Sequence, residues 1–497
     1  MSRSLSSPRL LFVGCFIALI TTSFGFLLRV LLMEGWAKEF NLSATQQGEL
    51  FGVGLWPFAI SIVLLSLFID RIGYKPAMVF GFLCHLASLV MTITAKDYEG
   101  LYWANFVVAL GNGTVEAYIN PVVATQFRND KARWLNILHA GWPGGMVIAG
   151  LIVLSMGGLH WHLKMLLLAV PAVAYFAILI VQEFPLNERV AAGVSYRTML
   201  GEVGAAGAFI ITWLVTVELA RSAFGAQSPM LVGTVVAVLV ALAAFALVRT
   251  FGRPLFILLL LVMVPLATTE LGVDSWVSQL LGPAMEKAGF HGIHILIYTA
   301  ALMMVLRFFA GPLLHRLSPV GMLALCSGVA AAGLFALAGA TTVAGIFACA
   351  TIYAVGKTFF WPTMLGVVAE QFPKGGALTL NATGGVGMLG VGVLGAMLMG
   401  NFQDRAMDRT LLAQDAAIHS KIMVEKQGLL GTYQAVDEAR VQALPVEQQA
   451  VVSTVGEQAK RSALRAIVVL PLLMLGFFVS LALWFRYKGG YRPVTAG

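Results

Sequence analysis

The amino-acid sequence predicts an all-α integral membrane protein with fourteen transmembrane helices. Two observations lead to this fold class. Of the 497 residues, 59% are hydrophobic and only 11% are charged, whereas a typical soluble domain carries about 25% charged residues. Apolar runs of about 20 residues, the length that crosses a hydrocarbon core of about 30 Å, recur along the whole chain. This composition excludes disorder, a secreted disulfide scaffold and a soluble multidomain enzyme.

Each apolar run predicts a helix, because backbone N–H and C=O groups in lipid must bond within their own segment. The first six runs are residues 10–33, 50–69, 76–94, 101–125, 135–156 and 163–182. Two further runs, 203–220 and 230–248, follow a polar segment. The second set of six covers residues 255–281, 293–314, 320–340, 343–369, 378–400 and 464–485. The predicted division is therefore an N-terminal six-helix bundle (1–184), a linker with two extra helices (185–253) and a C-terminal six-helix bundle (254–497).

The loop charges predict the orientation, since lysine and arginine in short loops favour the cytoplasmic side. With the N-terminus inside, the cytoplasmic segments hold 16 of these residues, and the short outer loops with the helix ends beside them hold five. We therefore expect a multi-pass protein of the plasma membrane or bacterial inner membrane, with both termini in the cytoplasm. We expect it to act as a monomer in the lipid bilayer.

One extramembrane segment, residues 401–462, lies between the last two helices and outside the cell in this topology. It has eight acidic and seven basic residues, and Pro445 interrupts it. Its alanine, glutamine and leucine content predicts short helices lying on the outer face. A solvated cap or spacer fits this segment, and so does a role in gating or partner binding.

The motifs of catalysis and cofactor binding are missing from the sequence. All four cysteines fall inside predicted spans at unrelated spacings, which indicates packing residues rather than a disulfide or a metal site. Neither His-Glu-x-x-His nor Gly-x-Ser-x-Gly occurs. We therefore expect a protein that is not an enzyme, that uses no cofactor or metal, and that binds no nucleic acid.

An internal repeat relates the two six-helix sets at an offset of 245 residues. Asn136 in the fifth helix matches Asn381 in the second set, and each belongs to a Leu-Asn pair that follows a Gln-Phe pair by nine residues. Pro121 and Pro362 also correspond, with four extra residues after the second. Polar matches of this kind indicate two copies of one ancestral fold.

The loop after the second helix contains Ser66, Asp70, Arg71, Gly73 and Lys75. This stretch resembles the loop signature of the major facilitator superfamily, Gly-x-x-x-Asp-Arg-x-Gly-Arg-Lys, without its first Gly and one Arg. The resemblance implies the major facilitator fold, two six-helix bundles, here with two extra helices in the central linker. Asp70 and Arg71 form the predicted cytoplasmic gate, because such charges can bridge to the neighbouring half and separate when the halves rock.

Further motifs resemble the fucose/proton symporter and glucose/galactose transporter group of that superfamily. They are Glu-Ala-Tyr-Ile-Asn-Pro at residues 116–121, Leu135-Asn136 with Gly144-Gly145 in helix five, Arg307-Phe308-x-x-Gly311 in helix eight and Trp361-Pro362-Thr363 in helix ten. That group also has an acidic residue in helix one, where the charge in this chain is Arg29. Arg307 is expected to pack at the inner half of helix eight.

Five charges within the predicted spans are of most interest, since a charge at the bilayer centre costs about 2.5–3.5 kcal/mol and therefore faces a cavity or a partner. They are Arg29, Glu116, Glu270, Asp274 and Lys357. The resemblance places them on helices one, four, seven and ten, which line the central cavity of the facilitator fold. Buried pairs, Arg29 with Glu116 and Lys357 with Asp274, and a role in proton coupling are both compatible with this placement.

Polar and aromatic residues recur three or four positions apart beside these charges, which predicts a substrate-binding face. Amides bond hydroxyl groups and aromatic rings cover the apolar face of a sugar, so such a face suits a hexose or a similar polyol. The predicted substrate-binding residues are Asn112, Asn120, Asn136, His139, Trp142, Trp276, Gln279, Tyr353, Trp361 and Asn381.

The sequence thus favours a secondary active transporter that moves a small polar solute, a hexose or deoxyhexose, by alternating access with proton coupling. Glu116 and Asp274 are the proton candidates, and Glu270 can substitute for Asp274. Two alternatives stay open. One is an organic-anion transporter in which Arg29 and Lys357 bind a carboxylate, and the other is a membrane sensor that binds its ligand without transport.

Overall fold

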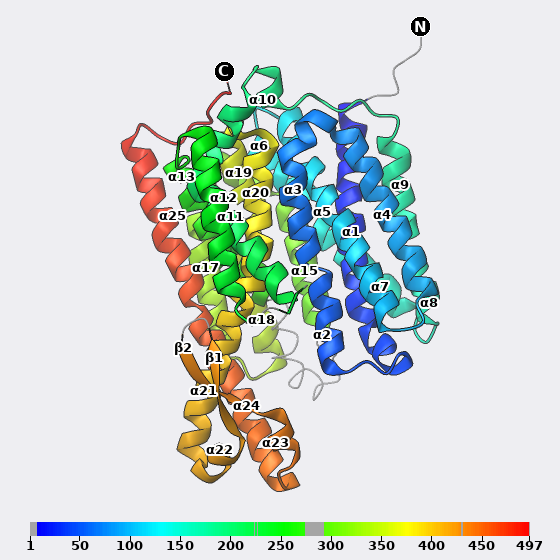
Figure 1. Ribbon diagram of the computed structural model, residues 1–497, viewed down its shortest axis with the longest axis vertical. Coiled ribbons are helices and arrows are strands. Elements are labelled where there is room, and N and C mark those ends of the chain that lie inside the picture. The colour runs from blue at the N-terminus through cyan, green and yellow to red at the C-terminus, as the bar shows by residue number, and fades with distance from the viewer. Residues whose placement is uncertain (1–6, 223, 226, 274–292, 429–430, 497) are drawn as a thin grey trace.

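The computed structural model describes residues 7–222, 224–225, 227–273, 293–428 and 431–496. Helices run side by side along the long axis, and the start of α1 (Pro8–Glu39) and the end of α25 (Val469–Tyr487) lie at the same end of the bundle (Figure 1). We call this end the terminus side and the opposite end the far side. The all-α prediction for the spans is confirmed.

The first six predicted spans correspond to the helices before the polar linker, and we call them the first half. Three of these spans consist of two consecutive helices separated by a short break. The elements after α1 are α2 (Ala44–Val53), α3 (Trp56–Ile72), α4 (Tyr74–Thr94), α5 (Tyr98–Gln126), α6 (Lys131–His139), α7 (Gly141–Ser155), α8 (Trp161–Leu166) and α9 (Ala169–Leu179). The short helix α10 (Glu188–Ala191) and the two extra helices, α11 (Tyr196–Ser222) and α12 (Pro229–Val248), follow.

The remaining spans form the second half. Their elements are α13 (Pro254–Ala267), the π-helical turn η1 (Thr268–Gly272), α15 (Ile293–Phe308), α16 (Ala310–Arg316), α17 (Pro319–Gly339), α18 (Val343–Lys357), α19 (Phe360–Gln371), the 3-10 turn η2 (Pro373–Gly375), α20 (Gly376–Gly390), the π-helical turn η3 (Val391–Gly395), α21 (Ala396–Gln414), α24 (Val446–Ile467) and α25. Predicted residues Asp274, Trp276 and Gln279 lie outside the described part of the chain.

Helix starts follow local capping rules. Ser43 caps the start of α2 with a capping box. Its side chain accepts from the Gln46 N–H, and the Gln46 side chain accepts from the Ser43 N–H. Asp97 and Thr342 accept from the N–H groups three residues later and start α5 and α18. These caps satisfy N–H groups that have no partner within the helix.

The number of spans differs slightly from the predicted fourteen. Among the described residues, 12 helices are long and apolar enough to cross a membrane, and the pair α15 and α16, bent by 58°, is a thirteenth if it forms one span. The predicted fourth span is the 29-residue helix α5, which is not among these because it is less apolar. It is nevertheless packed inside the bundle against α3 and α4.

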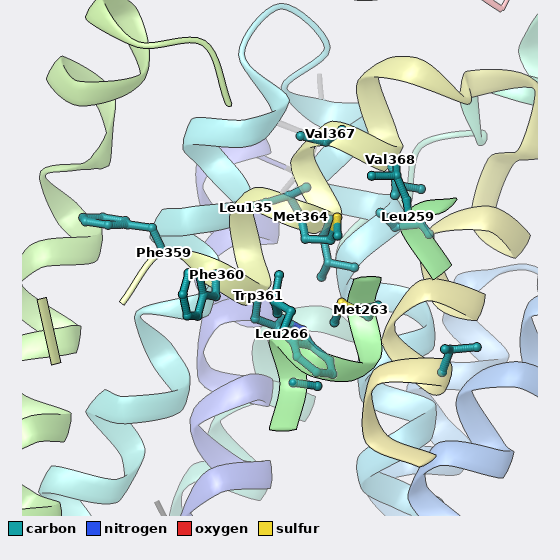
Figure 2. Close-up of a cluster of buried hydrophobic side chains, with 14 of the residues drawn as sticks. Leu135, Leu259, Met263, Leu266, Phe359, Phe360, Trp361, Met364, Val367 and Val368 are labelled. Carbon is teal, nitrogen blue, oxygen red and sulfur yellow. The ribbon is translucent and has the colours of Figure 1, made fainter. Parts of the chain in front are cut away.

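The main hydrophobic core extends across both halves. Figure 2 shows one part of it, where Leu135 of α6 in the first half lies beside Met364 of α19 in the second half. Met263 and Leu266 of α13 and the Trp361 side chain pack into the same cluster, and all of these side chains are buried. Apolar contacts therefore join the halves close to the middle of the molecule.

Residues 401–462 form a compact outer domain rather than only short helices lying on a surface. Helices α21 and α24 continue beyond the bundle and carry α22 (Ala416–Ile422), β1 (Met423–Gly428), β2 (Gly431–Val436) and α23 (Glu438–Gln442), which project from the far side (Figure 1). The strands are antiparallel, with Met423 opposite Val436. A separate core that includes Leu411, Ile422 and Val455 holds the domain together. Composition predicted its helices but not this core or the hairpin.

A close contact between two glycines, Gly204 and Gly252, lies at a kink inside α11. Gly204 has φ +61°, and a Cβ added to it would lie 2.0 Å from the backbone nitrogen of Gly252. The adjacent N–H groups of Ala205 and Ala206 donate to the carbonyls of Thr250 and Phe251 at 3.1 Å. Only glycine allows both the positive φ and this approach.

Replacing Gly204 by Ala is therefore expected to lower the free energy of unfolding by more than the ~1–2 kcal/mol that a left-handed conformation costs a residue with a Cβ. The control is Gly193→Ala, since Gly193 has φ +66° with open space around it. Thermal unfolding in detergent, followed by tryptophan fluorescence, measures both. Equal losses in the two variants would contradict the steric role of Gly204.

Candidate functional site

A continuous series of buried hydrogen bonds begins at Glu116 in the first half. The Asn120 side-chain nitrogen donates to Oε2 of Glu116 at 2.6 Å. Because that nitrogen donates, the Asn120 oxygen is the acceptor for Nε2 of His139, 2.9 Å away. Helices α5 and α6 position these three side chains, all of which are buried.

The series reaches the second half through Arg307 of α15. Its guanidinium donates to the His139 carbonyl at 2.7 Å and to Oε1 of Glu270 at 2.8 Å. It also donates to the Thr358 carbonyl at 2.7 Å, while the backbone N–H of Trp361 donates to the other Glu270 oxygen at 3.0 Å. A buried charge is stable only when its donors are satisfied, and these contacts satisfy Arg307 from both halves.

Arg307 is thus far more central than the sequence predicted. The prediction treated it as a packing residue of helix eight, but the structure pairs it with one of the central charges, Glu270. The available signal was its position as a lone arginine inside an apolar run, which favours a buried partner. Its partner could not be predicted because helix rotation is set by tertiary packing.

Arg29 has different partners from the predicted Glu116. Its guanidinium donates to the Gly25 carbonyl at 3.0 Å and to the Ser88 hydroxyl at 2.7 Å. Its Nε has no hydrogen-bond partner, and no carboxylate of the described residues pairs with Arg29. The side chain lines a small cavity formed by α1, α2 and α5, with Asn105 and Asn112 among the other lining residues.

Two residues of α4 complete this polar region, and the sequence interpretation missed both. Ser88 accepts from Arg29 and donates to the Ala104 carbonyl at 2.7 Å. His85 lies 3.0 Å from the Asn112 oxygen and 3.1 Å from the Tyr175 hydroxyl. The signal was a polar stripe at helical spacing, His85 and Ser88 three apart, on an otherwise apolar helix.

Three aromatic members of the predicted substrate face, Trp142, Tyr353 and Trp361, lie in the described part of the chain, and each packs against neighbouring side chains. The Tyr353 ring lies 5.0 Å from the Lys357 ammonium nitrogen, and the Tyr353 hydroxyl donates to the Thr269 carbonyl. The Trp361 side chain belongs to the apolar cluster of Figure 2. Trp142 lies 6.0 Å from the ring of Phe26, which lines the Arg29 cavity.

The repeat-related asparagines both bond across the two halves. Asn136 of α6 donates to the Thr363 hydroxyl of α19 at 3.1 Å, and Asn381 of α20 donates to the Ala117 carbonyl of α5 at 2.9 Å. These residues were predicted to bind substrate. In this conformation their amide nitrogens donate to the opposite half.

Lys131, Ala132 and Asn136 of α6 meet Thr363, Ala369 and Glu370 of α19 in what we call the terminus-side interface. The Lys131 ammonium donates to the Ala369 carbonyl at 3.1 Å and to Glu188 of α10 at 2.6 Å. The Ala132 N–H donates to Oε1 of Glu370 at 3.2 Å. These contacts join the two halves at this end.

The predicted gate residues bind the linker instead of the neighbouring half. Asp70 accepts two hydrogen bonds from Arg189, at 3.0 and 2.9 Å, and Arg71 lies 4.3 Å from the ring centre of Tyr196. The prediction of a bridge between halves through this motif is therefore wrong for this conformation. Lys131 makes that bridge.

The end of the chain is attached to the same interface. The Tyr491 hydroxyl donates to Oε2 of Glu370 at 2.8 Å, and the Val494 N–H donates to the Glu370 carbonyl at 2.8 Å. Burial and the neighbouring carboxylate raise the pKa of Tyr491, so its hydroxyl keeps the proton that it donates. Glu370 thus contacts the first half and the C-terminal segment at once.

The comparison with protein families identifies this architecture. Residues 10–396 match the Major Facilitator Superfamily. The chain belongs to this superfamily. It is therefore a multi-pass membrane transporter of small solutes and not an enzyme. Members of the major facilitator superfamily move their solutes through a path between two such halves.

Individual relatives within the major facilitator superfamily are distant. Over 143 residues the chain is 26% identical to the gentisate transporter of Corynebacterium glutamicum, a match that covers 28% of the chain and about a third (32%) of that relative. Among solved structures, the human organic anion transporter MFSD10 has 11% identity and a TM-score of 0.59, over 95% of this chain and 99% of that one.

Two sugar symporters of the superfamily have the same fold. The proton:xylose symporter XylE has 12% identity and a TM-score of 0.60, over 95% of this chain and 96% of that one. The E. coli fucose:proton symporter FucP has 14% identity and a TM-score of 0.56, over 94% and 99%. At these identities the likeness establishes the fold alone.

Replacing Asn136 or Asn381 by Ala is expected to favour separation of the halves at the terminus side. Each loses one cross-half hydrogen bond, worth about 1 kcal/mol or about fivefold in population. Spin labels on the exposed positions Arg128 and Lys374 measure the distance distribution between the halves. Ser327→Ala is the control, because that buried hydroxyl donates only within its own helix, to Leu323. An unchanged distance distribution in both asparagine variants would show that these hydrogen bonds do not hold the halves together.

Proposed function

We propose that this transporter carries an organic anion and that Arg29 binds its carboxylate. The observation that supports the proposal is a buried guanidinium that has no carboxylate partner within the described residues and an unpartnered Nε. A buried charge without a counterion is costly. A substrate carboxylate would supply that counterion through charge-assisted hydrogen bonds.

The size of the Arg29 cavity fits this role in the present conformation. It has about 30 Å³ of room for the centres of water molecules, which corresponds to two or three waters at about 10–15 Å³ each. A carboxylate group fits such a space, whereas a whole hexose needs the halves to move apart. Lys357 is the second proposed cation of the path, as the anion alternative predicts from the sequence.

Two relatives are consistent with an anion. The partial relative is a gentisate transporter, and one solved neighbour is an organic anion transporter. Gentisate is a hydroxylated aromatic carboxylate, so amides beside the guanidinium could bond its hydroxyl groups. A small hydroxylated monocarboxylate is therefore the proposed substrate class.

A sugar is the second candidate substrate, and the lining of the same cavity favours it. Asn105 and Asn112 supply amides, and Phe26 and Phe51 supply aromatic rings. Amides that bond hydroxyls and rings that cover an apolar face would also suit a hexose. The two candidates differ in whether Arg29 has to be charged.

We further propose that Glu116 carries a coupling proton. It is buried and bonded to the Asn120 amide, and no cation of the described residues pairs with it. Glu270, in contrast, is paired with Arg307. A buried carboxylate without a cation can take up and release a proton as its surroundings change.

We also propose that both termini lie in the cytoplasm and that the transporter is a monomer.

Replacing Arg29 by Gln is expected to weaken binding of a hydroxybenzoate about 10- to 100-fold, because a hydrogen bond to a charged group contributes about 1.5–3 kcal/mol. Arg29→Lys keeps the charge and should lose less. Binding is measured by thermal shift and by uptake into proteoliposomes, with hexoses in parallel and exposed Arg316→Gln as control. Saturable hexose uptake that survives Arg29→Gln would favour the sugar candidate instead.

Replacing Glu116 by Gln is expected to abolish accumulation driven by a pH gradient while leaving exchange of substrate across the membrane. The amide cannot change its protonation, yet it is close to isosteric and can still bond Asn120. Labelled substrate is followed in proteoliposomes with and without an imposed gradient. Full gradient-driven accumulation in Glu116→Gln would show that the proton is carried elsewhere.

A further inference from the structure

A second cavity lies on the far side, away from the path between the halves. It measures about 670 Å³ and is formed by α2, the start of α5 and the end of α11, a size within the range of about 300–1,000 Å³ for small-molecule sites. We call it the far-side groove. Its lining residues are Gly48, Glu49, Gly52, Val53, Trp56, Tyr98, Glu99, Tyr102, Trp103, Glu218, Arg221 and Ser222.

The groove lies at the far-side ends of the helices that form it. Helix α2 is at the far side in Figure 1, and α5 begins and α11 ends at this level. Tryptophan and tyrosine are typical of the boundary between membrane and water, because one part of the ring system is apolar and another part bonds water. Trp103 is about half exposed, at 53%, and packs edge-on against Phe106 with 5.4 Å between ring centres.

The charges of the groove are predominantly negative. Glu218 is already neutralised, since it accepts from Arg221 at 2.8 Å and from Ser222 at 2.6 Å. In the described parts of the chain, Glu49 accepts only from the neutral Tyr98 hydroxyl, at 2.5 Å. Glu99 is exposed and makes no hydrogen bond or ion pair within the described residues. Two carboxylates therefore remain available to a cationic group.

The α2 side of the groove also has open apolar space next to Glu49. A Cβ added to Gly48 or Gly52 would have no atom within 4 Å. These glycines are four apart and therefore share one face of α2. Together with Val53 and Trp56 they leave an apolar surface next to Glu49 and Glu99, which suits a ligand with a charged head and an apolar body.

We propose that the far-side groove binds the headgroup of a phospholipid that carries a primary ammonium, of the phosphatidylethanolamine type, from the far leaflet. The ammonium lies between Glu49 and Glu99, which accept its N–H bonds. Arg221 uses one nitrogen for Glu218 and directs remaining donors to the phosphate. The glycerol and upper acyl chains lie along the glycine face of α2.

Charge and hydrogen bonding together select this headgroup. An anionic glycerol headgroup would face two uncompensated carboxylates. A choline headgroup has a positive charge but no N–H to donate, so it cannot bond them. A primary ammonium satisfies both requirements, with three donors for two carboxylates.

Native mass spectrometry of the purified full-length protein tests the proposal. The protein is given an equimolar mixture of phosphatidylethanolamine, phosphatidylcholine and phosphatidylglycerol with identical acyl chains. We expect phosphatidylethanolamine to be retained about tenfold more than phosphatidylcholine, because only the ethanolamine ammonium can donate charge-assisted hydrogen bonds to the carboxylates. Glu99→Gln and Glu49→Gln should each reduce this preference, and Gly52→Leu, which fills open space, should abolish it.

Matched controls separate the groove from general effects. Glu447→Gln removes a carboxylate from α24, and Gly456→Leu fills equally open space on the same helix. Neither control should change lipid retention. Equal retention of ethanolamine and choline lipids, preference for phosphatidylglycerol, or insensitivity to all three groove variants would overturn the proposal. Displacement of the lipid by equimolar glycerophosphoethanolamine would overturn it in favour of a soluble amine ligand.

Discussion

The centre of this protein depends on the hydrogen bonds that the buried Arg307 guanidinium donates. Lipid offers no hydrogen-bond partners, so a guanidinium among apolar helices must find its acceptors within the protein. Arg307 finds them on three separate segments, at Glu270, at the Thr358 carbonyl and at the His139 carbonyl of the other half. The positions of η1, α18 and α6 are consequently linked through one side chain. Any separation of the halves has to exchange the His139 contact for another.

Around this centre, small and polar groups add to the apolar contacts that join the two halves. A Cβ on Gly366 would lie 2.7 Å from Ala132, so backbones approach closely there. Arg29 differs from Arg307, because its hydrogen bonds stay within the first half and its Nε has no partner. One buried arginine therefore links the two halves, while the other keeps one guanidinium nitrogen without a hydrogen-bond partner.

The sequence predicted the spans well because hydropathy depends only on local composition. It also identified Asn136 and Asn381 as equivalent, since a repeat is visible in the order of residues. It did not reveal that both side chains cross to the other half, or that Arg307 joins Glu270, because these contacts depend on how each helix is rotated and tilted. The gate motif shows the same limit, as Asp70 is bonded to Arg189, more than 100 residues away in the chain. The hairpin of the outer domain lacked a hydropathy signal of its own.

The outer domain has a mechanical consequence. Helix α21 continues from η3, and α24 is separated from α25 by the single helical residue Val468, so the domain is a stiff extension of the last two spans. A small tilt of the second half would be converted into a larger displacement at β1 and β2, as at the end of a lever. A fluorophore or antibody fragment attached there would report the tilt from outside the bundle, without touching the path that a solute follows.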